Sequence, residues 1–166
     1  MNISLIVAVG SNNEIGKNNA LIWHMPADMK FFKEKTTGHC IITGRKNYES
    51  IPLKFRPLPN RTNIVVTRQP DYDAPGAILV DSIEAAIKTA KATGDNEIFI
   101  IGGADIFRQS LHLVDTIYLT RIHESFDADV FFPELNLAEW KEVSSTKGLR
   151  DEKNVYDFTF LVYKKR

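Results

Sequence analysis

Hydrophobic and polar residues alternate along the chain in short blocks, which predict strands and helices in turn. Six short runs rich in Ile and Val have the composition of strands that are buried on both faces of a sheet. These runs occupy residues 3–9, 40–43, 63–67, 77–80, 97–101 and 116–122. Helix signals stand between them: Pro26 opens the segment PADMKFFKEKT, and Ser82 and Gly94 bound the segment IEAAIKTAKAT. The alternation predicts a mostly parallel sheet with helices on both faces.

The last part of the chain has a different pattern. Residues around 140–144 and 155–163 are rich in aromatic and β-branched residues without helical spacing, which predicts an antiparallel hairpin at one edge of the sheet. Residues 1–166 contain no internal repeat, low-complexity tract or long linker, so we expect one domain. In a sheet of this kind ligands bind beyond the carboxyl ends of the strands. Candidate site residues are therefore expected where strands end.

Composition narrows the possible classes of function. The chain has 166 residues, of which 43% are hydrophobic and 25% charged, as in a globular domain with a single core. Its 21 basic residues equal its 21 acidic ones, so no net positive field favours nucleic acid or anionic lipid. Cys40 is the only cysteine, and the pattern shows neither a signal peptide nor a membrane-spanning run. We therefore expect a cytoplasmic monomer that binds neither nucleic acid nor membrane.

Charge is nevertheless distributed unevenly along the chain. Residues 44–68 hold six basic residues and one acidic residue, for a net charge of +5. Residues 124–142 hold one basic and six acidic residues, for a net charge of −5. A single exposed cation is usually just solvated, but the 44–68 cluster suits phosphates and carboxylates of small molecules. We expect this stretch to face an anionic ligand.

Asp28 is the first candidate for chemistry. It lies in the first turn of the helix expected after Pro26, where an acid commonly complements the helix dipole and has no further role. Its neighbours Trp23 and Phe32 are apolar, however, and a carboxyl buried beside them has a raised pKa. Such a group is suited to proton transfer or to binding a cationic heterocycle. Position alone leaves both interpretations open.

Glycine followed by a helix start marks the ends of two predicted strands, at Gly44 and at Gly102-Gly103. Glycine lets backbone N–H groups approach a phosphate at a helix N-terminus, although a tight turn without a ligand is the alternative. The full G-x-G-x-x-G fingerprint and the P-loop are absent. The four histidines and the cysteine lack metal-ligand spacing, and no G-x-S-x-G elbow is present, so we expect neither a metal site nor a serine hydrolase.

Several short motifs, taken in their order along the chain, resemble one family. They are Ile15-Gly16, Trp23 with Pro26-Ala27-Asp28, Phe32, Gly44-Arg45 with Glu49-Ser50-Ile51, Arg56-Pro57-Leu58-Pro59 with Arg61, and Ile101-Gly102-Gly103. The ordered set closely resembles bacterial dihydrofolate reductase over nearly the whole chain. The resemblance implies a three-layer α/β fold: a mostly parallel eight-stranded central sheet with an antiparallel C-terminal edge, flanked by four helices. It also implies NADPH-dependent reduction of 7,8-dihydrofolate to tetrahydrofolate, in support of one-carbon metabolism and thymidylate synthesis.

The same resemblance implies a substrate site for dihydrofolate. Asp28 would bind the 2-amino and N3 edge of the pterin and assist protonation of N5, with Thr120 on the same edge. Arg61 would pair with the α-carboxylate of the glutamate tail, and Arg56 would be a looser partner of that tail. The walls implied for the pterin and aminobenzoyl rings are Ile6, Ala8, Phe32, Ile51 and Leu58.

The cofactor site implied by the resemblance has three parts. The nicotinamide would lie beside Ala8, Ile15, Gly16, Asn19, Ala20 and Leu21. The diphosphate would lie on Gly44, Lys46, Asn47, Gly102, Gly103 and the helix start formed by Ala104, Asp105, Ile106 and Phe107. The adenosine 2′-phosphate would lie among Arg45, Thr67 and Arg68. The loop 14–23, with Leu21 and Trp23, would close over the nicotinamide as a lid.

The chain departs from the family pattern at three places. Ile22 stands where proline usually precedes the tryptophan, Asp105 puts an acid at the cofactor helix, and residues 52–55 lengthen a loop. Two other functions stay open. One is a reductase of the same fold that acts on a pyrimidine of riboflavin biosynthesis, which Asp28 and Arg61 disfavour. The other is a nucleotide-binding paralogue without catalysis, whose sign would be a replaced Asp28 or a broken glycine pair.

Overall fold

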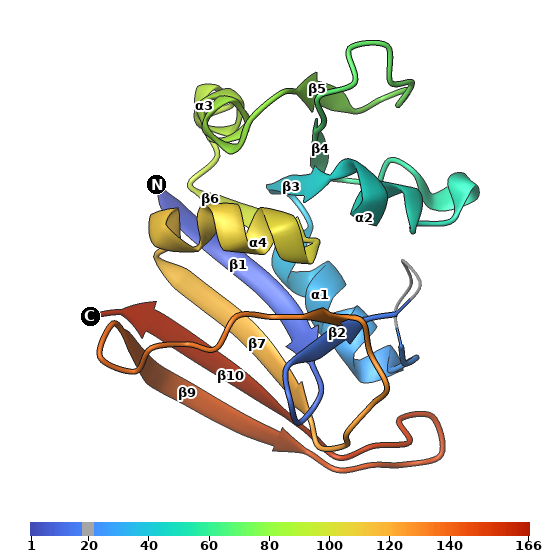
Figure 1. The fold of residues 1–166 in the computed structure, drawn as a ribbon, viewed down its shortest axis with the longest axis vertical. Helices are drawn as coiled ribbons and strands as arrows, with labels where there is room; N and C mark the ends of the chain where they lie inside the picture. The colour runs from blue at the N-terminus through green and yellow to red at the C-terminus, as the bar shows by residue number, and fades with distance from the viewer. Residues whose placement is uncertain (18–21) are drawn as a thin grey trace.

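The computed structural model describes residues 1–17 and 22–166. Within them, eight strands form one sheet in the order β5-β4-β3-β6-β1-β7-β10-β9 (Figure 1). The strands are β1 (Asn2–Val9), β3 (Cys40–Gly44), β4 (Thr62–Val66), β5 (Ile78–Val80), β6 (Glu97–Gly102), β7 (Thr116–Ile122), β9 (Trp140–Gly148) and β10 (Phe158–Lys165). The first six run parallel, and β10 pairs antiparallel with both β7 and β9. The expected mostly parallel sheet with an antiparallel C-terminal edge is confirmed.

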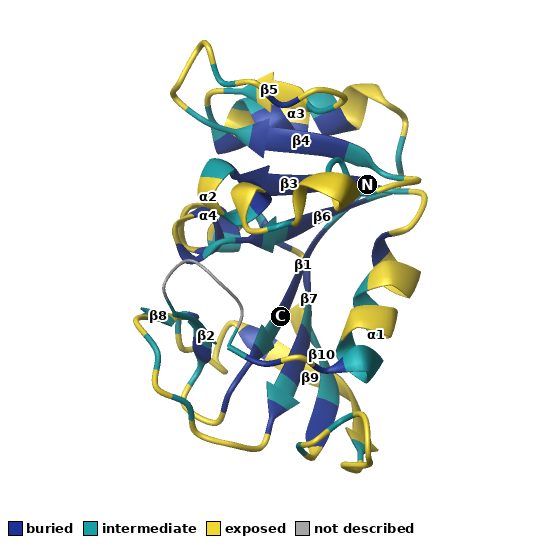
Figure 2. Ribbon diagram, turned by 90° about the vertical axis from the view of Figure 1, so that its right-hand side faces the viewer, coloured by how far each residue is buried: buried dark blue, intermediate teal, exposed yellow. Residues whose placement is uncertain are grey.

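Helices cover both faces of the sheet. They are α1 (Pro26–Thr36), α2 (Arg45–Glu49), α3 (Ile83–Ala92) and α4 (Ala104–Ser110), with short 3-10 turns η1 (Leu53–Phe55) and η2 (Leu111–Leu113). The alternation of β1 shows the layering: Leu5 and Val7 pack in one cluster with α3 and α4, whereas Ile6 packs on the opposite face with Phe31 and Phe32 of α1. Strands buried on both faces explain the continuous apolar runs of the sequence (Figure 2).

The structure differs from the sequence prediction mainly outside the central sheet. A small second sheet joins β2 (Glu14–Gly16) to β8 (Val130–Phe131), and strands of three and two residues are too short to show a periodicity. The C-terminal hairpin strands extend to Gly148 and Lys165, and the second begins at Phe158 because residues 149–157 form the connecting loop. Among the described residues, no helix is long and apolar enough to cross a lipid bilayer.

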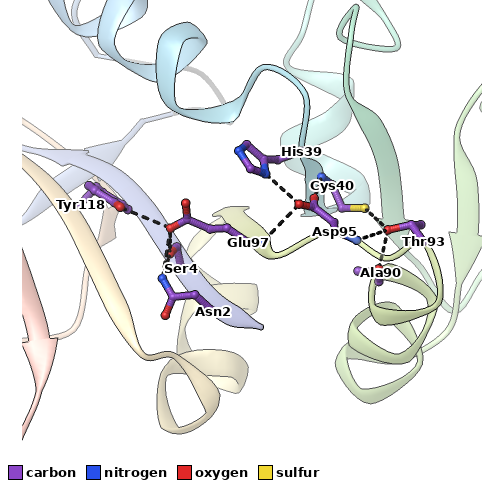
Figure 3. A network of polar contacts seen from close by, with 9 residues as sticks. All are labelled: Asn2, Ser4, His39, Cys40, Ala90, Thr93, Asp95, Glu97 and Tyr118. Atoms are coloured by element: carbon purple, nitrogen blue, oxygen red, sulfur yellow. Dashed lines mark hydrogen bonds and ion pairs between the residues drawn. The ribbon is translucent and has the colours of Figure 1, made fainter.

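Polar side chains tie the amino ends of the central strands together (Figure 3). Glu97 Oε2 of β6 accepts hydrogen bonds from Ser4 Oγ of β1 at 2.6 Å and from Tyr118 Oη of β7 at 3.3 Å. Asp95 accepts from the Cys40 backbone N–H at 2.7 Å and lies 2.8 Å from His39 Nδ1. Burial raises the pKa of Tyr118 to about 12, together with the Glu97 carboxylate, so this phenol stays a neutral donor. The acids at this end of the sheet are structural.

Candidate functional site

The candidate site lies at the opposite end of the sheet, where α1 begins beside the carboxyl ends of β1 and β7. Pro26 is the first residue of α1, and its fixed φ and missing N–H suit that position. Asp28 follows in the first turn, with its backbone N–H bonded to Met25 O at 3.0 Å. Its carboxyl is hydrogen-bonded by the Thr120 side chain of β7. Because Ala8 of β1 pairs directly with Thr120, the three residues predicted for the pterin site lie together.

Burial dominates the electrostatics of Asp28. It raises the pKa of the carboxyl above the usual 3.8, and the hydrogen bond from Thr120 only partly offsets this effect. A carboxyl in such a place responds strongly to a cationic partner, because few water molecules compete for its charge. The interpretation of Asp28 as a chemically active group therefore gains support over that of a solvated first-turn acid.

Apolar side chains form the walls around α1. Ile6, Phe32 and Leu58 belong to one cluster with the buried Ile41 and Phe99. Ala8 belongs to a neighbouring cluster that holds Trp23, Met25 and Ala27. Ile51, also expected in these walls, is partly buried and packs against a different cluster, which holds Tyr48 and Val65. The described walls thus come from α1, β1 and the loop that carries Leu58.

The two arginines expected for the glutamate tail have different surroundings, and Arg61 lies at the far end of α1. Arg61 donates through Nη1 to Thr36 Oγ1 at 3.1 Å and through Nε to Pro59 O at 2.8 Å. Thr36 ends α1, eight residues after Asp28, so the backbone positions of these two residues are about 12 Å apart along the helix axis at 1.5 Å per residue. Arg56 instead lies over the Tyr48 ring at 5.6 Å, and its buried Nε has no partner among the described residues.

The expected diphosphate site is a turn held by side-chain hydrogen bonds. Thr43 and Gly102 are paired at the carboxyl ends of β3 and β6, and Thr43 Oγ1 donates to Gly102 O at 3.0 Å. Asn47 Nδ2 of α2 donates to Thr43 Oγ1 at 2.9 Å. Thr43 was not among the predicted site residues, because a threonine inside a β-branched run carries no distinguishing signal. Its buried hydroxyl fixes the two predicted glycine turns relative to each other.

Missing side chains allow close packing at two glycines of this turn and leave the backbone open at the third. A Cβ on Gly44 would lie 2.9 Å from Ile106 Cγ1, and one on Gly102, whose φ is +119°, would lie 3.1 Å from Phe107 Cζ. Ile106 and Phe107 thus pack behind the glycines, at the start of α4. A Cβ on Gly103 would meet nothing nearer than Asn47 Cβ at 4.0 Å. Two helix starts and the open backbone at Gly103 lie where neighbouring strands end, and this arrangement fits a diphosphate.

Charged residues expected around the 2′-phosphate lie on α2 and after β4. Arg45 is paired with Glu49 one turn later at 3.0 Å, whereas Arg68 is exposed. Lys46, which was expected at the diphosphate, is exposed beside Arg45. Thr67 Oγ1 accepts from the Gln69 backbone N–H at 3.1 Å and so shapes the turn that carries Arg68. Asp105 at the start of α4 accepts from Arg108 at 3.3 Å and from Gln109 at 2.9 Å. Its charge is thereby partly balanced within its own helix.

The expected lid is described only at its two ends. Ile15 and Gly16 lie in β2, and Gly16 O accepts a hydrogen bond from the Asp129 backbone N–H at 3.1 Å. Trp23 packs against Phe126 with 5.1 Å between ring centroids. Both ends therefore contact the 123–131 segment. The predicted residues Asn19, Ala20 and Leu21 lie outside the described part of the chain.

Within the described residues, no group of three or more His, Cys, Asp or Glu side chains is arranged to hold a metal ion.

Comparison with known proteins is consistent with this geometry. A family model described as dihydrofolate reductase matches residues 2–165. The chain is 46% identical to the dihydrofolate reductase of Bacillus subtilis (strain 168) over 164 residues, which cover 99% of this chain and 95% of the relative. It is 46% identical to the dihydrofolate reductase of Haemophilus influenzae, with 98% of each chain covered. The solved structure of the Enterococcus faecalis dihydrofolate reductase complexed with NADP(H) is similar, with a TM-score of 0.90, 38% identity, and coverage of 99% of this chain and 96% of that one.

Proposed function

Because the chain belongs to the dihydrofolate reductase family and reduces dihydrofolate to tetrahydrofolate with NADPH, we propose that Asp28 is the residue that drives this reduction at neutral pH. The observation that carries the proposal is the half-buried Asp28 carboxyl at the start of α1, which is hydrogen-bonded by Thr120 and has a raised pKa because of its burial. The reaction adds a hydride to C6 and a proton to N5 of the pterin. When bound, NADPH supplies the hydride.

Asp28 acts on the substrate through its charge and its two oxygens. Its carboxylate accepts hydrogen bonds from the 2-amino group and the N3 side of the pterin, and Thr120 completes that edge. A negative charge with little competing water stabilises a pterin that is protonated at N5. Protonation at N5 makes C6 electron-poor, which lowers the barrier to addition at that carbon. The apolar walls formed by Ile6, Ala8 and Phe32 exclude water from this centre.

The second end of the substrate site lies at the end of α1. We assign the glutamate tail to Arg61, whose guanidinium is oriented by Thr36 and Pro59 and can pair with a carboxylate through its remaining N–H groups. Leu58, between the two ends, faces the aminobenzoyl ring, and Ile51 and Arg56 contribute at the outer rim. One helix thus sets the spacing between the group that binds the pterin and the group that binds the tail.

The cofactor is assigned to the glycine turns at the carboxyl ends of β3 and β6. Gly44, Gly102 and Gly103 bring backbone N–H groups to the diphosphate, together with the starts of α2 and α4. Ala8, Ile15 and Gly16 are assigned to the nicotinamide. Thr67 and Arg68 receive the 2′-phosphate, joined by Arg45 once that side chain leaves Glu49, and Lys46 is assigned to the diphosphate. The diphosphate is thus assigned to glycine backbone N–H groups, and the 2′-phosphate is assigned to positively charged side chains.

The role of Asp28 predicts a pH dependence of the wild-type enzyme. Hydride transfer in a single turnover is expected to slow as the pH rises from about 6 to about 9, because protonated N5 becomes scarcer. Rapid mixing of the enzyme–NADPH complex with dihydrofolate, followed by loss of reduced-nicotinamide absorbance, measures this step. A rate that stays flat over the range would contradict the proposal.

Arg68→Ala is expected to weaken NADPH roughly tenfold or more and to leave NADH nearly unchanged, because only NADPH carries the 2′-phosphate and a charged hydrogen bond is lost. Titration of both cofactors gives the two dissociation constants. Arg150→Ala is a matched control, since Arg150 is also exposed but lies in the loop beyond β9, at the opposite edge of the sheet. Equal losses for the two cofactors would place the 2′-phosphate elsewhere.

We propose further that residues 1–166 form one domain and that the enzyme is a monomer in the cytoplasm. The main apolar core draws side chains from strands at both ends of the sequence, including Leu5 of β1 and Trp140 of β9, so it is completed within the chain. Light scattering of the purified protein tests the monomer, with a mass near 18.8 kDa expected.

A further inference from the structure

Helix α1 begins without a cap from its own neighbours in sequence. Met25 stands at the N-cap position and makes no side-chain hydrogen bond there. Pro26 has no N–H to satisfy, and the N–H groups of Asp28 and Met29 both bond to Met25 O at 3.0 Å. Ala27 is therefore the first-turn residue whose N–H needs a partner from elsewhere. Ala27 directly precedes Asp28.

That partner comes from the hairpin loop between β9 and β10. Asn154 Oδ1 accepts the hydrogen bond from the Ala27 backbone N–H at 2.8 Å, although the two residues are 127 positions apart. The loop lies near the start of α1 in both views of the ribbon (Figures 1 and 2). Asn154 thus caps the helix as a side chain at the N-cap position normally does.

The loop is built to present the Asn154 side chain. Asp151 accepts hydrogen bonds from the Asn154 backbone N–H at 2.7 Å and from Asn154 Nδ2 at 3.2 Å, and its own N–H donates to Asn154 O at 2.7 Å. These bonds fix the amide so that Oδ1 is the atom left for Ala27. Tyr156, two residues later, packs in the same cluster as Ala27 and Trp23. Polar and apolar contacts therefore join the loop to the helix start.

We propose that Asn154 is a positioning residue for Asp28, acting through the Ala27 N–H. The proposal rests on the role of Asp28 in the proposed function. Fixing Ala27 fixes the first turn of α1, and this turn directs the Asp28 carboxyl toward Thr120 and the pterin. The loop at the edge of the sheet thereby determines the geometry of the reacting end of the substrate site. Catalytic geometry is sensitive to displacements on the order of 1 Å.

Asn154→Ala tests the proposal, with Ser82→Ala as a matched control. Ser82 caps α3 by accepting from the Ala85 N–H at 3.0 Å, and α3 lies on the other face of the sheet. Both substitutions remove one helix cap and are expected to lower the melting temperature by similar amounts. Only Asn154→Ala is expected to slow single-turnover hydride transfer and to raise the KM for dihydrofolate, each about fivefold. The dissociation constant of NADPH is expected to stay unchanged in both variants.

The exchanged double variant Asp151→Asn/Asn154→Asp keeps an acceptor oxygen for the Ala27 N–H and keeps one amide facing one carboxylate in the loop, so it is expected to recover most of the hydride-transfer rate. The proposal is overturned if Asn154→Ala loses stability but transfers hydride like Ser82→Ala, or if the exchanged double variant is as impaired as Asn154→Ala. Failure of the proposed function gives a different result, namely an Asp28→Asn enzyme that transfers hydride at the wild-type rate. The two failures are thus separated by which variant behaves unexpectedly.

Discussion

Asp28→Asn is expected to lose turnover at pH 7 by about a hundredfold or more, the usual contribution of a positioned acid or base. Asparagine keeps the size of the side chain and its hydrogen bond to Thr120 but removes the negative charge. Without that charge, the pterin protonated at N5 is no longer stabilised in the site. Steady-state assays with saturating NADPH measure the loss. Turnover close to the wild-type rate at pH 7 would remove Asp28 from the reaction.

The loss is expected to shrink in acid. At low pH dihydrofolate is already protonated in solution, so a variant that cannot stabilise the cation still receives the reactive form of the substrate. The ratio of wild-type to variant kcat/KM, followed from about pH 8 to about pH 5, is therefore expected to fall steadily. A ratio that is constant across this range would indicate that Asp28 acts in binding alone.

The same variant is expected to be more stable than the wild type at pH 7. The pKa of Asp28 in the folded chain is above its usual 3.8, so the folded state holds this proton more tightly than the unfolded state. The stability associated with the protonated carboxyl is fully present below pH 3.8 and is lost as the pH rises through the raised pKa. Asparagine does not titrate and escapes that loss. Urea unfolding at pH 7 and in acid is expected to show an advantage that disappears in acid.

Gly102→Ala is expected to destabilise the protein by about 1 to 3 kcal/mol. Its φ of +119° is a conformation that L residues rarely adopt, and the new Cβ would lie 3.1 Å from the Phe107 ring. The strain falls on the turn that joins β6 to α4 and carries the Thr43 hydrogen bond, so weaker NADPH binding is expected as well. Urea unfolding, with and without NADPH, measures both effects.

Gly103→Ala is the matched comparison at the next residue. Gly103 has an ordinary φ of −82°, and its Cβ would have open space around it, so the free energy of unfolding is expected to change little. If the diphosphate lies against this backbone, the added methyl group displaces it and weakens NADPH about tenfold by loss of a charged hydrogen bond. Normal NADPH affinity in Gly103→Ala would move the diphosphate away from this turn.

The strands and helices of the central sheet could be predicted because each carries its own local signal. Burial on both faces makes β1 and β6 continuously apolar, and Pro26 and Ser82 mark helix starts through their backbone chemistry. The pairing of β2 with β8 could not be predicted, because two short segments more than 110 residues apart form it. These two segments form strands because of their tertiary packing and not because of a local strand propensity.

The residues of the candidate site could be predicted from the order of motifs, but their contacts in the tertiary structure could not. Motif order placed Asp28 and Thr120 together, and the structure joins them by a hydrogen bond. It could not reveal that Ile51 packs against a different cluster, that Arg45 pairs with Glu49, or that Asn154 caps α1. Each of these contacts depends on how elements meet in space. A residue such as Asn154 is an ordinary loop asparagine in sequence and acquires a role only through its distant partner.

The order of strands in the sheet has a consequence for synthesis of the chain. β3, β4, β5 and α3 all lie between residues 40 and 92, and the three strands are neighbours in the sheet, so they can associate as soon as they are made. β1 is made first, yet both of its neighbours come later, β6 from Glu97 and β7 from Thr116. In a nascent chain that ends before Glu97, strands β3, β4 and β5 can already pair, but the apolar strand β1 has neither of its partners. Exposed apolar strands of this kind are the surfaces that chaperones bind and through which unfinished chains aggregate.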